Sequence, residues 1–166
     1  MQHDHAATTE IEETVMTKDE FYMGKALEEA ATAYAVGEIP IGAVIIYEKK
    51  AIARAYNLRE SLPCATAHAE LLAIEKACRA LGRWRLTGCT LYVTVEPCPM
   101  CAGAIVNSRL DRIVYGCADP KAGAVRSVFQ IVDTPALNHC TAVTQGIREK
   151  ECARLMTDFF RSRRQK

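Results

Sequence analysis

Helix and strand signals alternate along this chain, and their order constrains the fold more than any other sequence feature. Apolar residues recur at helical spacing from Lys18, and Gly37 follows as a helix stop. Two β-branched or aromatic runs, residues 41–47 and 51–56, flank Glu48-Lys49-Lys50, which is typical of a hairpin. The first third of the chain therefore predicts a helix followed by a hairpin.

The alternation continues to the C-terminus. The further predicted elements are a helix over 67–81 capped by Thr66, a strand over 90–95, a helix that begins at Pro97, a strand over 112–115, a short strand over 142–144 and a helix over 149–163. Residues 127–132 fit either a helix or an irregular segment. Because helices that alternate with strands pack on both faces of one sheet, we expect an α/β sandwich.

The composition fits one globular domain. Hydrophobic residues make up 49% and charged residues 25% of the sequence, which is ordinary for a soluble protein. A chain of 166 residues is too short for two domains of usual size. We expect a polar N-terminal extension over residues 1–17 and a single domain over 18–166. A net charge of +1 excludes nucleic-acid binding by bulk charge, so RNA contact would need a local basic patch such as residues 161–166.

The eight cysteines suggest thiol chemistry and not a disulfide framework. The N-terminal residues contain no basic run followed by an apolar stretch, so no secretory signal is recognised. The longest apolar run, residues 41–47, falls far short of the roughly 20 residues that a membrane helix needs. We therefore expect a cytoplasmic protein with no membrane segment, in which cysteines are metal ligands or core residues.

Two short segments carry residue types suited to metal chemistry, Ala67-His68-Ala69-Glu70 and Glu96-Pro97-Cys98-Pro99-Met100-Cys101. A Cys-x-x-Cys pair alone could be a redox pair or half of a structural zinc site. No second such pair accompanies it, and one His with two Cys leaves the open position that a catalytic zinc requires. We predict one Zn²⁺ per chain, bound by His68, Cys98 and Cys101.

Glu70 follows His68 by two residues, which suits a proton shuttle better than a fourth ligand. Both segments begin predicted helices, where free backbone amides favour anions such as thiolates. A carboxylate there could take a proton from zinc-activated water and return protons to a ring nitrogen and to departing ammonia. His-x-Glu with Pro-Cys-x-x-Cys is the pattern of zinc deaminases that act on nucleobases. The sequence therefore predicts a zinc-dependent deaminase.

At these residues the chain resembles the cytidine deaminase-like superfamily and, within it, the bacterial tRNA-specific adenosine deaminases. The resemblance runs from the first helix to the C-terminus. It includes residues 38–44, Asn57, 66–70, 91–98, 101–104, 119–121, 138–139 and 158–161. It implies a three-layer α/β/α sandwich around a five-stranded mixed sheet, usually assembled as a homodimer.

The resemblance also implies a reaction and a partner. The expected activity is hydrolytic deamination of adenosine to inosine at the wobble position of a tRNA anticodon, and the expected partner is the anticodon stem-loop of an arginine tRNA. Asn57 matches the asparagine that hydrogen-bonds the flipped purine, and Ala69 matches a backbone contact to the base. Pro40 and Ile41 match the wall of that pocket. Taken alone, Asn57 would be typical of a turn.

Further positions match the RNA-facing parts of the family. The matching residues are Asp119 and Lys121 in a loop, and Phe160, Arg161, Arg163 and Arg164 in the C-terminal helix. A solvated basic tail is the alternative for the arginines. Two loops depart from the family pattern. Cys64-Ala65 stands where the family commonly has Asp-Pro, and Val125-Arg126 follows Ala122-Gly123-Ala124 where the family usually continues with small residues. Both departures bear on RNA specificity and not on the zinc chemistry.

Two other functions fit the motif. One is a deaminase of a free base or nucleoside, such as guanine, cytosine or cytidine, which needs no RNA-binding surface. The other is a zinc-stabilised scaffold without turnover. Glu70 argues against the scaffold, because a scaffold has no use for a carboxylate aimed at an open zinc position.

Overall fold

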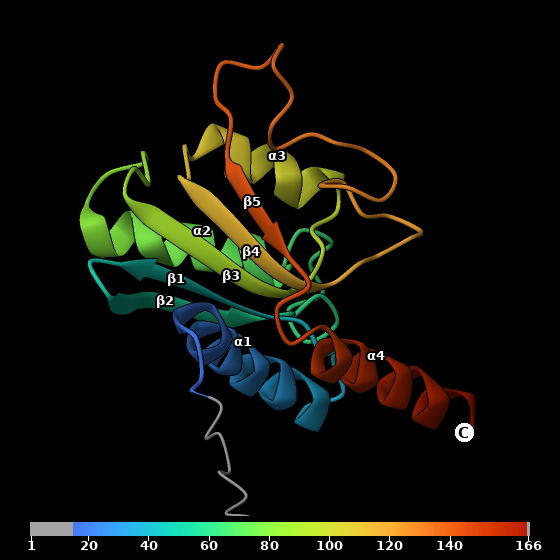
Figure 1. Cartoon of the computed structure of the whole chain (residues 1–166). Coiled ribbons are helices and arrows are strands. Elements are labelled where there is room, and N and C mark those ends of the chain that lie inside the picture. The colour runs from blue at the N-terminus through green and yellow to red at the C-terminus, as the bar shows by residue number, and fades with distance from the viewer. Residues whose placement is uncertain (1–14, 166) are drawn as a thin grey trace, which may run out of the picture.

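The computed structural model describes residues 15–165, so most of the predicted N-terminal extension, residues 1–14, lies outside the described residues. Nine elements follow the predicted order (Figure 1). They are α1 (Lys18–Ala35), β1 (Gly42–Tyr47), β2 (Lys50–Tyr56), α2 (Ala69–Leu81), β3 (Cys89–Val95), α3 (Pro99–Asn107), β4 (Arg112–Cys117), β5 (Ala142–Gln145) and α4 (Glu149–Arg164).

The strands form one five-stranded sheet in the order β2-β1-β3-β4-β5. The hairpin strands β1 and β2 pair antiparallel, as do β1 and β3, whereas β3, β4 and β5 run parallel to one another. Parallel neighbours need a crossover connection, which α3 supplies between β3 and β4. The predicted mixed sheet is confirmed.

Helices cover both faces of this sheet, with α2 and α3 on one side and α1 and α4 on the other (Figure 1). Successive strand residues point to opposite faces. In β1, Ala43 and Ile45 belong to the core beneath α2 and α3, while Val44 and Ile46 belong to the core beneath α1 and α4. Both faces of the strand are therefore buried, which explains its uninterrupted apolar sequence. The three-layer α/β/α sandwich is confirmed.

Helices α2 and α3 each begin two residues later than predicted. Their N-caps are His68 and Cys98, both with extended backbone. Thr66 does not cap α2, because it lies two residues before the N-cap, and its hydroxyl is 3.3 Å from the thiol of Cys64 in the preceding turn. The later starts place two predicted metal ligands at the exact points where chain direction changes from loop to helix.

The segment that the sequence left open, residues 127–132, is irregular. Backbone hydrogen bonds from Val128 to Gly123 and from Ile131 to Ala124 fold it back on the preceding loop.

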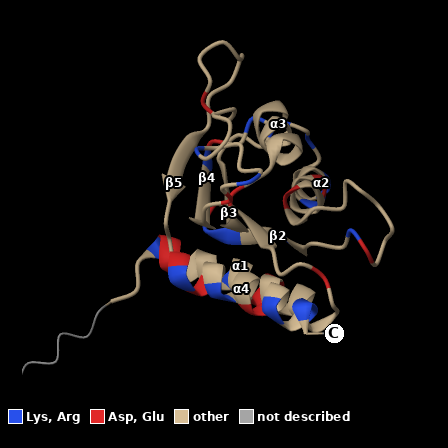
Figure 2. Ribbon diagram, turned by 90° about the vertical axis from the view of Figure 1, so that its right-hand side faces the viewer, with Lys and Arg blue, Asp and Glu red and all other residues tan. Residues whose placement is uncertain are grey.

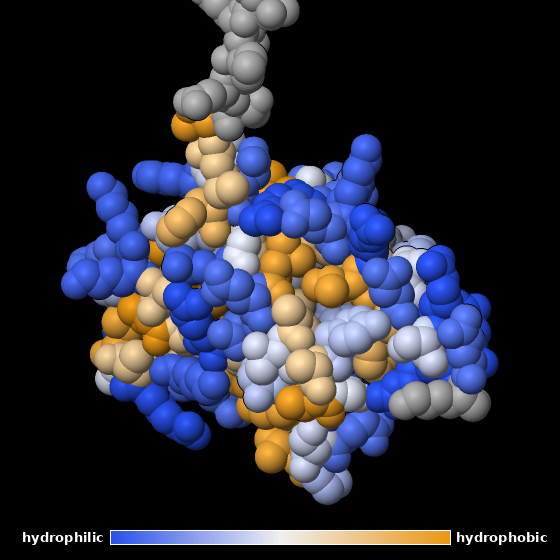
Figure 3. Space-filling view, turned by 90° about the horizontal axis from the view of Figure 1, so that it is seen from below, coloured by the Kyte–Doolittle hydropathy of each residue, from blue (hydrophilic) through white to orange (hydrophobic). Residues whose placement is uncertain are grey.

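The outer face of α1 and α4 presents hydrophilic side chains around smaller apolar areas (Figure 3). Within residues 15–165, none of the helices combines the length and the apolar character that crossing a membrane would require.

A polar network fastens α1 to the sheet. Arg112 of β4 donates two hydrogen bonds to the carboxylate of Asp19, at 3.0 and 2.6 Å, and another to Thr144 of β5 at 2.7 Å. The hydroxyl of Tyr92 in β3 donates to Asp19 at 2.7 Å. These contacts, led by the hydrogen bond from Arg112, hold the pKa of Asp19 below its ordinary value. One carboxylate thus joins the helix to two strands.

Replacing Asp19 with Asn should lower the free energy of unfolding at neutral pH by about 1–2 kcal/mol, because charge-assisted hydrogen bonds are lost. Because Asn does not titrate, the difference in the free energy of unfolding between the variant and wild type is fully present above the ordinary aspartate pKa of about 3.9. It disappears as the pH falls through the lower pKa that Asp19 has in the folded protein. Urea unfolding at several pH values measures this.

Glu28→Gln is the matched control for Asp19→Asn. Its partner Arg54 lies 3.5 Å away in an exposed pair, which should contribute little. Equal destabilisation by the two substitutions, or a difference for Asp19→Asn that persists at low pH, would contradict the role given to Asp19.

Candidate metal and substrate site

Three metal-ligand side chains converge where α2 and α3 begin. His68 and Cys98 are the N-caps of the two helices, and neither side chain makes a capping hydrogen bond to its own helix. Both side chains are therefore available to a shared ligand. Cys101 lies in the first turn of α3 and is fully buried.

The distances between these side chains suit a tetrahedral metal ion. Nδ1 of His68 lies 3.7 Å from Sγ of Cys98 and 3.6 Å from Sγ of Cys101, and all three ligand atoms lie within 4.8 Å of one another. Zinc bonds of about 2.3 Å to sulfur and about 2.0–2.1 Å to nitrogen separate such atoms by roughly 3.6 Å in a tetrahedron. The predicted residues thus form a set that can hold Zn²⁺ with a fourth position left over.

Electrostatics in this cluster favour the metal-binding protonation states. The pKa of Cys98 is lowered to about 4, first by a hydrogen bond from the thiol of Cys101 and then by His68. The pKa of Cys101 is raised, first by that same hydrogen bond to Cys98 and then by burial. Cys98 is therefore a thiolate at neutral pH, and the protons held by its neighbours are those that a bound cation displaces.

Glu70 lies in a small cavity of ≈ 60 Å³ beside this cluster. Its side chain is 4% exposed, and burial raises its pKa above the usual glutamate value. A raised pKa makes the carboxylate a better proton acceptor near neutral pH. The cavity is lined by Ile39, Ile41, Asn57, Arg59, His68, Ala69 and Glu70.

Asn57 forms a turn, which the sequence offered as the alternative to a base contact, and its side chain also borders the small cavity. Its Oδ1 accepts a hydrogen bond from the backbone N–H of Arg59 at 3.3 Å, as in an Asx turn. Within residues 15–165 its amide nitrogen makes no hydrogen bond, and the side chain borders the small cavity. The turn fixes the side chain so that its NH₂ group remains a donor for a ligand.

Two larger cavities of ≈ 450 and ≈ 470 Å³ adjoin the small one. Ile39 lines all three, although the family resemblance implied its neighbours Pro40 and Ile41. Ile41 does line two of them, whereas Pro40 is buried. The three cavities therefore meet along the segment that enters β1.

The C-terminal helix contributes to the larger cavities through part of its predicted surface. Phe160, 43% exposed, lines both cavities, and Arg163 lines one of them. Arg163 also donates to the backbone oxygen of Gly37 and lies 4.7 Å from the ring of Phe159. Arg161 and Arg164 are exposed outside these cavities, at the basic end of α4 (Figure 2). The aromatic and one arginine thus face the site, and two arginines face solvent.

The loop after β4 also lines one of the larger cavities. Asp119, Pro120 and Lys121 line the ≈ 470 Å³ cavity. Oδ1 of Asp119 accepts hydrogen bonds from the backbone N–H groups of Lys121, at 3.1 Å, and Ala122, at 3.2 Å. This carboxylate therefore shapes its own turn as well as facing the cavity.

Two buried carboxylates near the site were given no role from the sequence. Glu38 is 1% exposed and accepts a hydrogen bond at 2.5 Å from the backbone of Ser61, in the loop that follows Asn57. Glu96 is 3% exposed and accepts several hydrogen bonds from the loop after β4. Burial alone would raise both pKa values, but these backbone hydrogen bonds outweigh it and lower them. The available signal was an acidic residue next to a buried apolar run in each case.

Comparisons with known proteins point to the same chemistry. A family model described as MafB19-like deaminase matches residues 17–164. The chain is 50% identical over 151 residues to a tRNA-specific adenosine deaminase of Bacillus subtilis (strain 168), an alignment that covers 91% of this chain and 94% of the relative.

Solved structures of two kinds of deaminase share this fold. One from a study of A-to-I editing by tRNA:A34 deaminases superposes with a TM-score of 0.78 at 45% identity, over 81% of this chain and 98% of the other. A guanine deaminase from Nitrosomonas europaea superposes with a TM-score of 0.71 at 25% identity, over 87% and 86% of the two chains. The fold is common to both, and the sequence is much more similar to the first.

The purified protein should carry about one zinc ion per chain, as a site with three protein ligands requires. His68→Ala and Cys98→Ala should each lose it, because two remaining ligands hold zinc weakly. Cys64→Ala is the control, since this exposed thiol lies near His68 in sequence but outside the ligand cluster. Metal analysis by mass spectrometry that found full zinc in the first two variants would show the ligand assignment to be wrong.

Proposed function

Because this chain belongs to the tRNA-specific adenosine deaminases, we infer that it deaminates adenosine in transfer RNA, and we propose that the reaction takes place in the small cavity beside Glu70. We further propose a single deaminase domain over residues 18–166 with one Zn²⁺ per chain. The observation that carries this proposal is that His68, which clusters with Cys98 and Cys101, lines the same small cavity as Glu70 and Asn57.

The metal and Glu70 divide the chemistry. When bound by the cluster, Zn²⁺ would lower the pKa of a coordinated water so that it can act as a nucleophile at neutral pH. Glu70 accepts one proton from the attacking water and gives it to the ring nitrogen; it then accepts the second proton of that oxygen and gives it to the amino group, which leaves as ammonia while the oxygen becomes the carbonyl. Its burial and raised pKa suit it to this exchange. A non-catalytic scaffold would need no such buried carboxylate.

The remaining residues of the small cavity orient the base. The NH₂ group of Asn57 can donate to an acceptor nitrogen of a purine, while Ile39 and Ile41 supply apolar walls. Ala69, between His68 and Glu70, leaves room for the base edge because its side chain is a methyl group. Together these residues hold one flipped base and exclude water from its reacting edge.

The larger cavities suit the nucleotides on either side of the target. Bases of a single-stranded loop are recognised by stacking on aromatic rings and by contacts to phosphates, for which Phe160, Arg163 and Lys121 are placed at cavity walls. We propose the wobble position of an anticodon stem-loop, in an arginine tRNA, as the substrate. We also propose a cytoplasmic homodimer on the basis of the family resemblance.

The exposed ends Arg161 and Arg164 would then meet RNA farther from the target base. Their exposure fits phosphate contact, which needs no shaped pocket. With a net charge of +1 such contacts are few, so specificity should come chiefly from loop shape and base contacts.

The protein should convert adenosine to inosine in an anticodon stem-loop far faster than it deaminates free adenosine, guanine or cytidine. The larger cavities bind neighbouring nucleotides that a free base lacks, so their binding energy is available only to RNA. Each substrate is incubated separately, with mass detection for the small molecules and inosine readout for the RNA. Rapid turnover of guanine together with no turnover of the stem-loop would instead support a free-base deaminase.

A further inference from the structure

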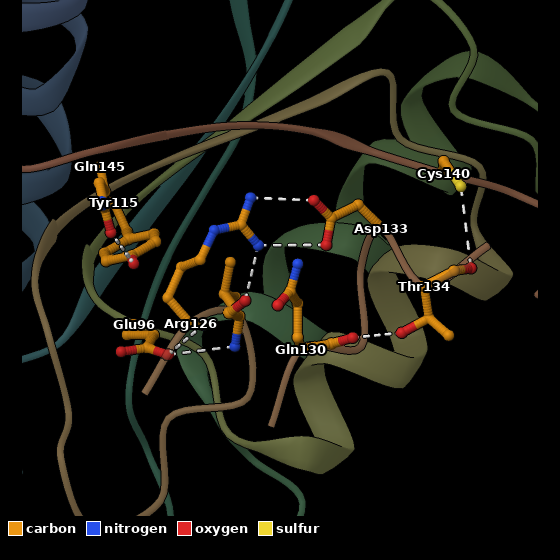
Figure 4. Close-up of polar contacts among 9 residues, drawn as sticks. Glu96, Tyr115, Arg126, Gln130, Asp133, Thr134, Cys140 and Gln145 are labelled. Atoms are coloured by element: carbon orange, nitrogen blue, oxygen red, sulfur yellow. Dashed lines mark hydrogen bonds and ion pairs between the residues drawn. The ribbon is translucent and has the colours of Figure 1, made fainter. Parts of the chain in front are cut away.

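Glu96 occupies the point where β3 ends and the metal-binding segment begins. Its side chain is 3% exposed, and it is followed at once by Pro97 and the ligand Cys98. A buried carboxylate is costly unless hydrogen bonds compensate for the lost hydration. The compensation here comes from one loop, residues 119–127, of which Figure 4 shows the contact with Arg126.

Both ends of that loop donate to the carboxylate. Oε1 accepts from the backbone N–H of Asp119 at 3.1 Å and from the hydroxyl of Ser127 at 2.5 Å. Oε2 accepts from the backbone N–H groups of Val125, Arg126 and Ser127, at 3.1, 2.9 and 2.9 Å. A single side chain therefore gathers the first residue and the last three residues of the loop.

The loop also fits closely around this carboxylate. A Cβ atom at Gly123 would lie 2.4 Å from Cδ of Glu96 and 2.5 Å from the backbone oxygen of Asp119, so only glycine fits without displacement. Ala124 donates from its backbone to the oxygen of Pro97 at 2.8 Å. The loop is thus packed against the start of the metal-binding segment.

A second contact closes the far side of the loop. The guanidinium of Arg126 donates to both oxygens of Asp133, at 3.1 and 2.9 Å, and to the backbone oxygen of Val125 at 2.8 Å (Figure 4). Arg126 is one of the two residues at which this loop departs from the family pattern. The Arg126–Asp133 ion pair therefore stabilises the same stretch, residues 125–127, whose backbone N–H groups donate to Glu96.

The first residues of the loop are those that face the substrate cavity. Asp119, Pro120 and Lys121 line the ≈ 470 Å³ cavity, as does Phe160 of α4. Glu96 is not among the residues that line this cavity. Any effect of Glu96 on substrate must act through the position of the loop.

We propose that Glu96 is a specificity-determining positioning residue, whose carboxylate holds residues 119–121 as a wall for the nucleotides next to the target adenosine. The inference rests on the proposed function, since it assigns this cavity to neighbouring nucleotides. Two neighbouring residues of one segment then have different roles: Cys98 is a metal ligand, and Glu96, two residues earlier, positions the loop that contacts RNA.

Glu96→Gln tests the proposal with little change in size. A Gln side chain keeps one accepting oxygen, so it can serve the N–H groups of residues 125–127 or the N–H of Asp119, but not both. KM for the anticodon stem-loop should rise roughly ten- to a hundredfold, as expected for loss of a charge-assisted hydrogen bond that positions the wall. Zinc content should be unchanged, and kcat should change far less than KM.

Amide hydrogen exchange supplies a readout that locates the effect. Exchange in Glu96→Gln should become faster within residues 119–127 and stay as in wild type in β1 and β3. Glu28→Gln is the control, because it removes one negative charge at an exposed position on α1 and should leave KM and exchange unchanged. Ser127→Ala is the milder variant in case Glu96→Gln folds poorly; it removes one donor, and KM should rise by several-fold.

Several results would overturn the proposal. An unchanged KM in both Glu96→Gln and Ser127→Ala would do so, and so would a loss of zinc and kcat at constant KM, which would make Glu96 an anchor of the metal segment instead. Failure of the proposed function is distinguishable, because wild-type protein would then not deaminate the stem-loop at all.

Discussion

Two helix N-termini meet beside the ends of the strands, and their N-cap residues are His68 and Cys98. At an N-cap the backbone is extended and the side chain can leave the helix axis, so two caps can point at one another. Nδ1 of His68 comes within 3.7 Å of the sulfur atoms of both Cys98 and Cys101 as a result. The free amides of the first helical turns also favour thiolate at this point. The α/β/α sandwich is the frame that brings the two caps together.

Three buried glutamates lie near the site, and their environments separate their roles. Glu38 and Glu96 accept backbone N–H groups from neighbouring loops, which lowers their pKa values and keeps them charged. Burial dominates at Glu70 and raises its pKa. Two carboxylates are thus fixed anions that shape loops, and the third is free to exchange a proton. Pairs of like groups with divergent environments are typical of acid–base sites.

Much of the fold and of the metal cluster could be predicted from the sequence. Period-two and period-3.6 patterns depend on local burial, so the order of elements and the hairpin after residue 47 were recognisable. The starts of α2 and α3 were placed too early, because the backbone stays extended through His68 and through Cys98, the residue before Pro99. Ile39 and Glu96 were missed as site residues because their roles depend on loops distant in sequence. Of the four matched α4 residues, only Phe160 and Arg163 line the cavities, which the helical period alone could not settle.

Turnover by Glu70→Gln tests the central claim most directly. The amide has nearly the shape of the carboxylate but cannot accept and return a proton. The account predicts a folded protein with wild-type zinc content whose single-turnover rate on the anticodon stem-loop falls by about 10²–10⁴-fold or more. A variant that keeps zinc and forms inosine at a rate near that of wild type would contradict the assignment of Glu70 as the proton shuttle.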